Sequence, residues 1–214
     1  MSTPPLPTLI YHITHIDNLP AILSSGELRA KTRLDTSGGP NTSIAYTSVQ
    51  DRRAQTPVPC GRGGTLHDYV PFYFAPRSPM LYTIHRGNVS TCPRQGPVVY
   101  LVSTAQVVRD ARLPYAFTDG HGIMALTSYF DDLVYLDAVD WAIMRDRYWS
   151  DTLTDNDRRR RRQAEFLVQN FMPWGLITQI GVISPTMKNN VEDMLRRFGP
   201  THKPAVAIHY DWYY

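Results

Sequence analysis

The segment Val98–Val102 restricts the fold of this chain more than any other feature of the sequence. Five apolar, mostly β-branched residues stand between Pro97 and Ser103, a pattern typical of a buried strand. Further short apolar segments are expected to be strands at residues 9–13, 69–74, 180–183 and 206–210, with 163–168 a strand or the start of a helix. Helical patterns separate them irregularly, so the sequence predicts a mixed α+β domain rather than a doubly wound sheet.

The segments between these strands carry helix and turn signals. Helices are expected after Asp17 or Asn18 as far as Gly26, over 104–112 and 141–149, and over 189–198 before Gly199. Polar residues 32–43, with strong turn chemistry at 37–41, and the proline- and glycine-rich residues 57–64 are expected to be loops. Residues 44–47 are expected to form a brief strand. Pro71 is expected to place its strand at an edge or bulge, because proline has no N–H.

Length and composition favour one globular domain over residues 1–214. A chain of 24.4 kDa with 43% hydrophobic and 19% charged residues can bury a core and is not typical of a disordered protein. Cys60 and Cys92 have neither metal-ligand spacing nor a dense disulfide pattern. The sequence has no secretory leader and no apolar run near the ~20 residues of a membrane span, so a cytoplasmic protein without membrane contact is expected.

Five consecutive arginines lead almost directly into one glutamate, Glu165, at the start of an apolar segment. Such a cationic run is typical of a surface that binds a polyanion, and the preceding Tyr148 and Trp149 suit stacking on bases. One interpretation is nucleic acid held beside a catalytic acid. The other is a solvated helix face on which Glu165 pairs with Arg161 or Arg162, and the charge run alone favours this second interpretation.

Four ordered blocks of sequence resemble the DarT family, the DNA ADP-ribosyltransferases of bacterial toxin–antitoxin systems. The blocks are Tyr11–Leu19, Leu66–Tyr82, Thr118–His121 and Arg161–Val168. The second block is long and highly specific, and the resemblance spans essentially the whole chain. It implies an ADP-ribosyltransferase fold of the diphtheria-toxin and PARP type, α+β, with a split, two-sheet β core and peripheral helices.

The resemblance also implies a reaction and its partners. NAD acts as a co-substrate that loses nicotinamide, and ADP-ribose is attached to a base of single-stranded DNA, most often thymidine. A DarG-like macrodomain antitoxin is the implied protein partner. The sequence contains no Gly-x-Gly-x-x-Gly or Walker A motif, so NAD is not expected to bind in the Rossmann manner. It contains no Cys-x-x-Cys or His-x-x-x-His pair either, and no metal is expected.

Site residues follow from the matched positions. Glu165 matches the family's catalytic glutamate, whose carboxylate would stabilise an oxocarbenium-like state. His12 and Thr14 match contacts to nicotinamide and ribose. Arg52 and Arg53 lie where the family carries an arginine facing the phosphates, the base or both, so both are also catalytic candidates. Which of the two faces the cleft is open.

The complete expectation comprises two sets of residues. The expected NAD-contacting residues are His12, Thr14, Asn18, Arg52, Arg53, Tyr73 and His121. The expected DNA-contacting residues are Tyr148, Trp149, Arg158, Arg159, Arg160, Arg161 and Arg162. Without the resemblance, a core histidine is the more common interpretation of His12. For His121, a turn histidine without a site role is nearly as good an interpretation as a contact with NAD or substrate.

Two other functions stay open at the level of sequence. The same fold could modify RNA or protein, which an acceptor test with labelled NAD would reveal. A non-catalytic module could bind single strands through the arginine run without releasing nicotinamide. The second alternative leaves the matches at Glu165 and His12 unexplained.

Overall fold

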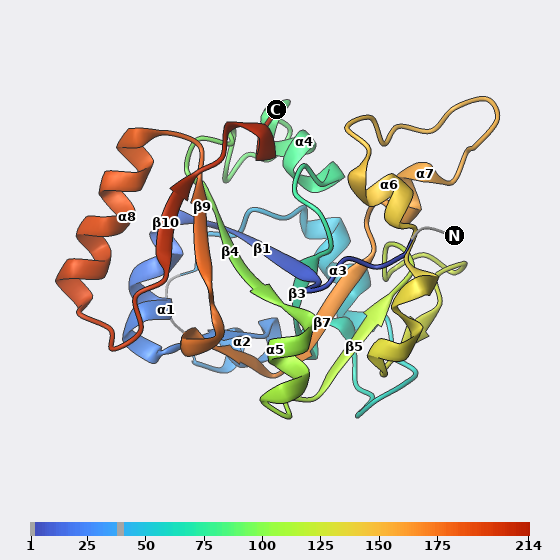
Figure 1. Cartoon of the computed structure of the whole chain (residues 1–214), viewed down its shortest axis with the longest axis horizontal. Coiled ribbons are helices and arrows are strands. Elements are labelled where there is room, and N and C mark those ends of the chain that lie inside the picture. The colour runs from blue at the N-terminus through green and yellow to red at the C-terminus, as the bar shows by residue number, and fades with distance from the viewer. Residues whose placement is uncertain (1–2, 38–40) are drawn as a thin grey trace.

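The computed structural model describes residues 3–37 and 41–214 (Figure 1). The strands are β1 Leu9–His15, β2 Glu27–Arg29, β3 Tyr69–Tyr73, β4 Val98–Thr104, β5 Tyr115–Thr118, β6 Tyr129–Phe130, β7 Glu165–Gln169, β8 Phe171–Pro173, β9 Gln179–Val182 and β10 Ala205–Ile208. The α-helices are α1 Leu19–Ser25, α2 Lys31–Ser37, α3 Thr47–Gln55, α4 Pro79–His85, α5 Ala105–Asp110, α6 Trp141–Arg145, α7 Arg158–Arg161 and α8 Pro185–Phe198. Short 3-10 helices are η1 Ile16–Asn18, η2 Leu66–Asp68, η3 Leu133–Ala138, η4 Trp174–Leu176 and η5 Tyr210–Trp212.

The main sheet consists of two halves that meet at one residue pair. Its strand order is β10-β9-β4-β1-β3-β7-β5-β6, and β2 and β8 form a separate two-stranded sheet. β1 pairs with β4 from Leu9 to His15, whereas β1 and β3 are in register only at Tyr11 and Tyr73. The two inner strands therefore diverge away from this pair. The expected α+β fold with a split β core is confirmed.

The strand β4 lies at the centre of the core, as Val98–Val102 predicted. Its residues are buried on both faces. Val99 and Leu101 pack into the larger hydrophobic cluster, which includes Leu19 of α1 and Val191 of α8, while Tyr100 packs into a second cluster. α1 and α8 cover one side of this half of the sheet (Figure 1).

Pro71 lies in an interior strand, so its expected place at a sheet edge is wrong. β3 pairs with β7 on one side, with Pro71 opposite Leu167. On the other side β1 has diverged, and the Pro71 carbonyl accepts a hydrogen bond from His12 Nδ1 at 2.8 Å. The nitrogen and carbonyl of one strand residue point to the same side. The missing N–H therefore faces the gap between the halves and removes no bond between strands.

Three local expectations also differ from the structure. The expected strand at 44–47 is wrong, since α3 begins at Thr47 and Ile44 packs into the core without strand pairing. Part of the expected 32–43 loop is the helix α2, and residues 38–40 lie outside the described part of the chain. The helix expected over 141–149 ends at Arg145. Within the described ranges, no helix is both long and apolar enough to cross a membrane.

Candidate active site

Glu165 is the first residue of β7 and is buried, with 2% of its surface exposed. Both carboxylate oxygens accept hydrogen bonds from Arg53 Nη1, at 2.9 Å and 2.8 Å. The Gly122 N–H lies 3.3 Å from Oε1, and the Glu165 N–H donates to Thr118 Oγ1. These contacts hold the carboxylate in one place away from bulk water. The alternative pairing of Glu165 with Arg161 or Arg162 is wrong.

The two neighbouring arginines of α3 point in different directions. Arg53 is buried against Glu165, and its Nη2 has no hydrogen-bond partner among the described residues. Arg52 is exposed and donates from Nη2 to the Ile123 carbonyl at 3.0 Å. Arg53 is therefore the arginine that faces the carboxylate, which the sequence left open.

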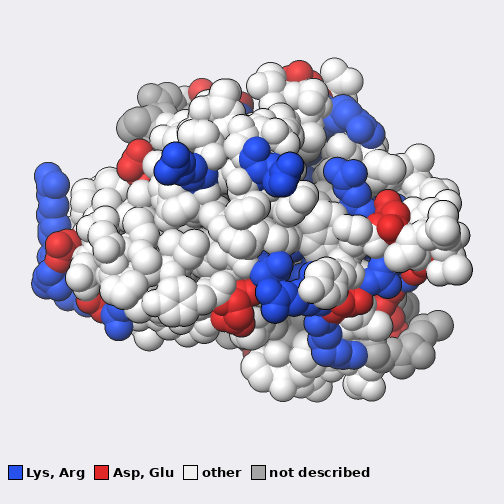
Figure 2. All heavy atoms as spheres, turned by 90° about the horizontal axis from the view of Figure 1, so that it is seen from above, with Lys and Arg blue, Asp and Glu red and all other residues white. Residues whose placement is uncertain are grey.

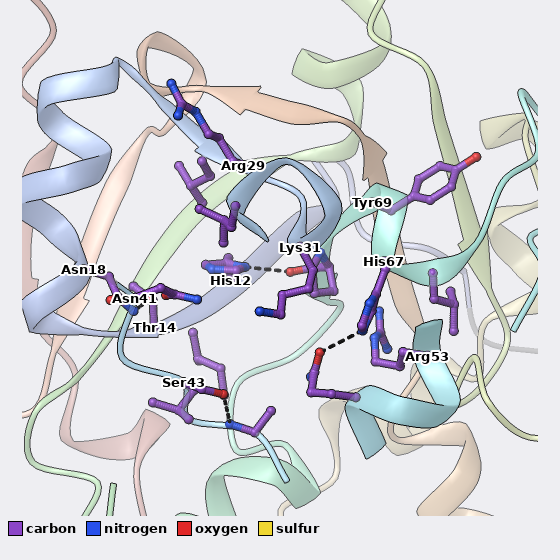
Figure 3. Close-up of a pocket in the computed structure, with 18 of the residues that line it drawn as sticks. His12, Thr14, Asn18, Arg29, Lys31, Asn41, Ser43, Arg53, His67 and Tyr69 are labelled. Atoms are coloured by element: carbon purple, nitrogen blue, oxygen red, sulfur yellow. Dashed lines mark hydrogen bonds between the residues drawn. The ribbon is translucent and has the colours of Figure 1, made fainter. Parts of the chain in front are cut away.

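His12 is held in β1 as a neutral ring. A carbonyl can only accept, so Nδ1 carries the proton that is donated to Pro71. Burial lowers the pKa of His12 despite this hydrogen bond. Nε2 is then unprotonated and can accept a hydrogen bond. Figure 3 shows the ring among the other residues that line the pocket.

Thr14 and Asn18 connect β1 to the segment that begins at Asn41. Asn18 Nδ2 donates to Thr14 Oγ1 and to the Thr42 carbonyl, each at 3.0 Å, and Oδ1 accepts from the Thr42 N–H at 2.8 Å. The Asn18 side chain makes no capping bond to α1. Its geometry instead fixes one wall of the pocket.

The first cavity, of about 270 Å³, lies where the halves of the sheet diverge. His12, Thr14, Asn18, Arg53, Tyr73, His121 and Glu165 all line it, which brings together the residues expected to contact NAD except Arg52. Arg29, Lys31 and His67 line it as well (Figure 3) and were not predicted. His67 lies in the matched block Leu66–Tyr82 but was not singled out, whereas Arg29 and Lys31 lie in no matched block. The three residues come from β2, α2 and η2 and meet only in the fold.

A second cavity, of about 420 Å³, adjoins the first. It is lined by α3, α4, α7 and the segment 151–157, and Tyr73 and His121 line both cavities. His121 Nε2 lies 4.0 Å from Glu165 Oε1, and burial lowers the pKa of His121. Burial and the nearby Glu165 raise the pKa of Tyr73. The titratable residues shared by the two cavities are thus a neutral imidazole and a protonated phenol beside one carboxylate. The other shared residues are apolar: Ile44, Ala45, Val49 and Met80.

Two predicted DNA-contacting residues are accessible at the surface. Tyr148 is 77% exposed. Arg159 is exposed, lines the second cavity, and has no side-chain ion pair within the part of the chain that the structure describes. Trp149 is different, because it is 8% exposed and its indole N–H donates to Tyr214 Oη at 2.6 Å. The expectation that Trp149 stacks on a base is wrong in this conformation.

The arginine run is not a free cationic face. Arg162 is buried and donates to the carbonyls of Ile143, Met144, Asp146 and Pro76, so its expected contact with DNA is wrong. Arg158, Arg160 and Arg161 form ion pairs with Asp119, Asp140, Asp146, Asp155 and Asp157. On the face drawn in Figure 2, basic side chains stand apart, several of them beside acidic ones.

Comparison with known proteins agrees with this geometry. The family model described as "ssDNA thymidine ADP-ribosyltransferase, DarT" matches residues 11–214. The chain belongs to the DarT family. The DNA ADP-ribosyl transferase of Thermus aquaticus is 46% identical over 212 residues, which cover 98% of this chain and 90% of that protein.

Two solved structures of the Thermus sp. 2.9 DarT are also similar. The complex with ADP-ribosylated ssDNA is 45% identical with a TM-score of 0.93, and the match covers 100% of this chain and 99% of the other. The complex with NAD+ is 42% identical with a TM-score of 0.88, covering 99% and 100%. The family function expected from the four sequence blocks is confirmed: this DarT-family chain is an NAD-dependent ADP-ribosyltransferase of single-stranded DNA.

Proposed function

We propose that this chain transfers ADP-ribose from NAD+ to a thymine base in single-stranded DNA at Glu165. The observation that supports this site is the position of Glu165, a buried carboxylate fixed by Arg53 beside Tyr73 and His121, which line both cavities. The first cavity would hold NAD+ and the second would admit the base. Donor and acceptor would then meet at the carboxylate.

The residues of the first cavity suit the parts of NAD+. His12 Nε2 is an acceptor in a buried wall, which suits the carboxamide N–H of nicotinamide. The hydroxyl of Thr14 suits a ribose hydroxyl. Arg29 and Lys31 line the same cavity and are cations that suit the diphosphate, although each also pairs with an acidic neighbour.

The chemistry proceeds by substitution at the ribose carbon that carries nicotinamide. The glycosidic bond breaks and its electron pair leaves with nicotinamide, while positive charge builds up on the ribose. The Glu165 carboxylate would stabilise this charge. Because the carboxylate is already fixed in place, no rearrangement of solvent is needed as the charge forms. A ring nitrogen of thymine then bonds to the carbon and releases its proton. His121, neutral and 4.0 Å from Glu165, is in a position to accept it.

We also propose a cellular setting for this reaction. A DarT-family toxin is expected to be opposed by a DarG-like macrodomain antitoxin in the bacterial cytoplasm, where DNA and NAD+ both occur. Coexpression with such a macrodomain should restore growth of cells that express this chain. A macrodomain variant with a disrupted ADP-ribose pocket should fail to do so.

Mass spectrometry of a short thymidine-containing oligonucleotide tests the reaction. After incubation with the protein and NAD+, the oligonucleotide should gain the mass of one ADP-ribose, and fragmentation should place it on a thymine. Oligonucleotides without thymidine should stay unchanged. Modification of RNA or of lysate protein in preference to DNA would contradict the proposal and favour another acceptor.

Strand state provides a second test. The ring nitrogens on the pairing edge of a base are hidden in a duplex, and flipping a paired base costs a few kcal/mol. The same oligonucleotide annealed to its complement should therefore react more slowly by orders of magnitude. Equal rates would indicate a base-flipping enzyme or attachment at an atom that the duplex exposes.

A further inference from the structure

Tyr214 connects two segments that are distant in sequence: the turn that leads into α4, whose Pro79 and Met80 line the second cavity, and a segment that supplies part of the wall of that cavity. Its hydroxyl donates to the Arg77 carbonyl at 2.6 Å and accepts from Trp149 Nε1 at 2.6 Å. Arg77 lies in the turn between β3 and α4. Trp149 lies in the segment between α6 and α7 (Figure 1), which supplies Asp151 and Asp157 to the cavity wall.

The ring of Tyr214 is held as firmly as its hydroxyl. The Arg77 guanidinium lies over the ring, 4.2 Å from its centroid. Tyr82 of α4 packs edge-on against both Tyr214 and Trp149, with centroid distances of 5.1 Å and 5.8 Å. The backbone of Tyr214 exchanges two hydrogen bonds with the Gln95 side chain. Tyr214 is therefore held at its hydroxyl, at its ring and at its backbone.

The turn at Arg77 needs such support. Its φ is 55°, in the left-handed region that non-glycine residues rarely adopt. The carbonyl of Arg77 accepts from Tyr214, and its guanidinium donates to the Tyr213 carbonyl at 2.6 Å. This turn sets the start of α4, whose Met80 lines both cavities.

The segment 146–157 is held near both ends by ion pairs, from Asp146 to Arg158 and from Asp155 and Asp157 to Arg161. It lacks helix and strand over its whole length, and Tyr148 and Leu153 are exposed. Arg162 holds its beginning through the Asp146 carbonyl, and Arg158 contacts Tyr148 and Ser150 through their carbonyls. Trp149 is the large side chain of this segment that is buried, so its contact with Tyr214 fixes the middle of the segment.

We infer that Tyr214 is a positioning residue for the acceptor: it fixes Trp149 and the turn at Arg77, and so shapes the cavity that admits the DNA base. This inference rests on the proposed function. Tyr214 lines neither cavity, so it would act through these two segments and not by touching NAD+ or the base. Loss of its hydroxyl should loosen the acceptor side and leave the NAD+ side intact.

The variants Y214F and Y213F test this role. Y214F removes a hydroxyl bonded to Trp149 and Arg77, whereas Y213F removes one bonded to the Val98 and Gly181 carbonyls in the core. Y214F should raise the KM for a thymidine oligonucleotide about five-fold and leave the KM for NAD+ within about two-fold, because the lost bonds lie on the acceptor side. Y213F should change neither KM, even though it removes a more buried hydroxyl.

Coupling and exchange measurements complete the test. W149F should also raise the oligonucleotide KM, and W149F/Y214F should resemble Y214F, because Y214F already removes the bond between Trp149 and Tyr214. Amide hydrogen exchange over residues 147–157 should quicken in Y214F and not in Y213F.

Equal KM effects of Y213F and Y214F, additive effects of W149F and Y214F, or unchanged exchange would each overturn the inference. An inactive wild-type protein would contradict the proposed function instead, while the exchange comparison would still decide the role of Tyr214.

Discussion

Arg53 binds both carboxylate oxygens of Glu165 through one nitrogen, Nη1, at 2.9 Å and 2.8 Å. Its other terminal nitrogen is buried without a hydrogen-bond partner among the described residues. The guanidinium therefore meets the carboxylate off-centre rather than as a symmetrical fork. The Arg53 side chain lines the first cavity beside Glu165.

Glu165→Gln tests the charge at this site. The amide keeps the size of the side chain but cannot stabilise an oxocarbenium-like ribose, so oligonucleotide modification should fall by at least about 10²–10³-fold. NAD+ affinity should change little, because the charge matters mainly in the transition state. Turnover measured by mass spectrometry and NAD+ binding measured by calorimetry check both parts. Residual turnover within ten-fold of the wild type would remove Glu165 from catalysis.

Arg53→Ala and Arg52→Ala form a matched pair on one helix. Removing Arg53 leaves a buried carboxylate without its partner, which should cost about 3–5 kcal/mol of unfolding free energy together with activity. Removing the exposed Arg52 should cost less than about 1 kcal/mol. Chemical denaturation of the two variants gives the comparison. Similar losses of stability in both would contradict the burial of Arg53.

Arg159→Ser tests the remaining accessible cation of the arginine run. If Arg159 contacts one phosphate, its loss should lower the slope of log affinity against log salt by about 0.7 for single-stranded DNA. Arg197→Ser on α8, which lies at the other end of the molecule from α7 (Figure 1), is the charge-matched control. Fluorescence anisotropy of a labelled oligonucleotide at several salt concentrations measures both slopes, and equal slopes would place Arg159 away from the DNA.

Arg162→Ser should behave differently from Arg159→Ser. The Arg162 guanidinium donates to four backbone carbonyls in the interior, so its removal leaves buried acceptors unsatisfied. The melting temperature should fall by several degrees, whereas Arg159→Ser should leave it nearly unchanged. Thermal unfolding of both proteins checks this. A stable Arg162 variant with a reduced salt slope would restore the sequence-based expectation of DNA contact.

His12 should make stability depend on pH in the acid range. Its pKa in the folded protein is lowered from the ordinary 6.5, so the unfolded chain binds the proton more readily. The contribution of the neutral ring is complete above pH 6.5 and is lost as the pH falls through the lower folded pKa. Between pH 7.5 and pH 5.5, the melting temperature of His12→Asn should therefore fall less than that of the wild type. His85→Asn, a change at an exposed histidine, should leave the wild-type fall unaltered.

The sequence alone indicated most of the strands, the family and most of the residues that line the candidate site. The apolar run Val98–Val102 identified the central strand. A strand that is buried on both faces carries apolar side chains throughout and does not alternate between apolar and polar residues. The sequence match around Glu165 and the match at His12 and Thr14 identified two sides of one pocket. Each match is a short motif of residues that are adjacent or nearly adjacent in sequence. Those predictions depended on short-range pattern, and the structure brings these residues to one cavity.

Only the tertiary structure decided which charges were free. Five adjacent arginines look alike in a sequence, yet Arg162 is buried on carbonyls, three are neutralised by aspartates from several segments, and Arg159 is left accessible. Pairing, burial and orientation depend on residues distant along the chain. Arg52 and Arg53 could not be distinguished for the same reason: which of them faces Glu165 is set by how α3 packs against η2 and β7, 112 positions away from Arg53 in sequence.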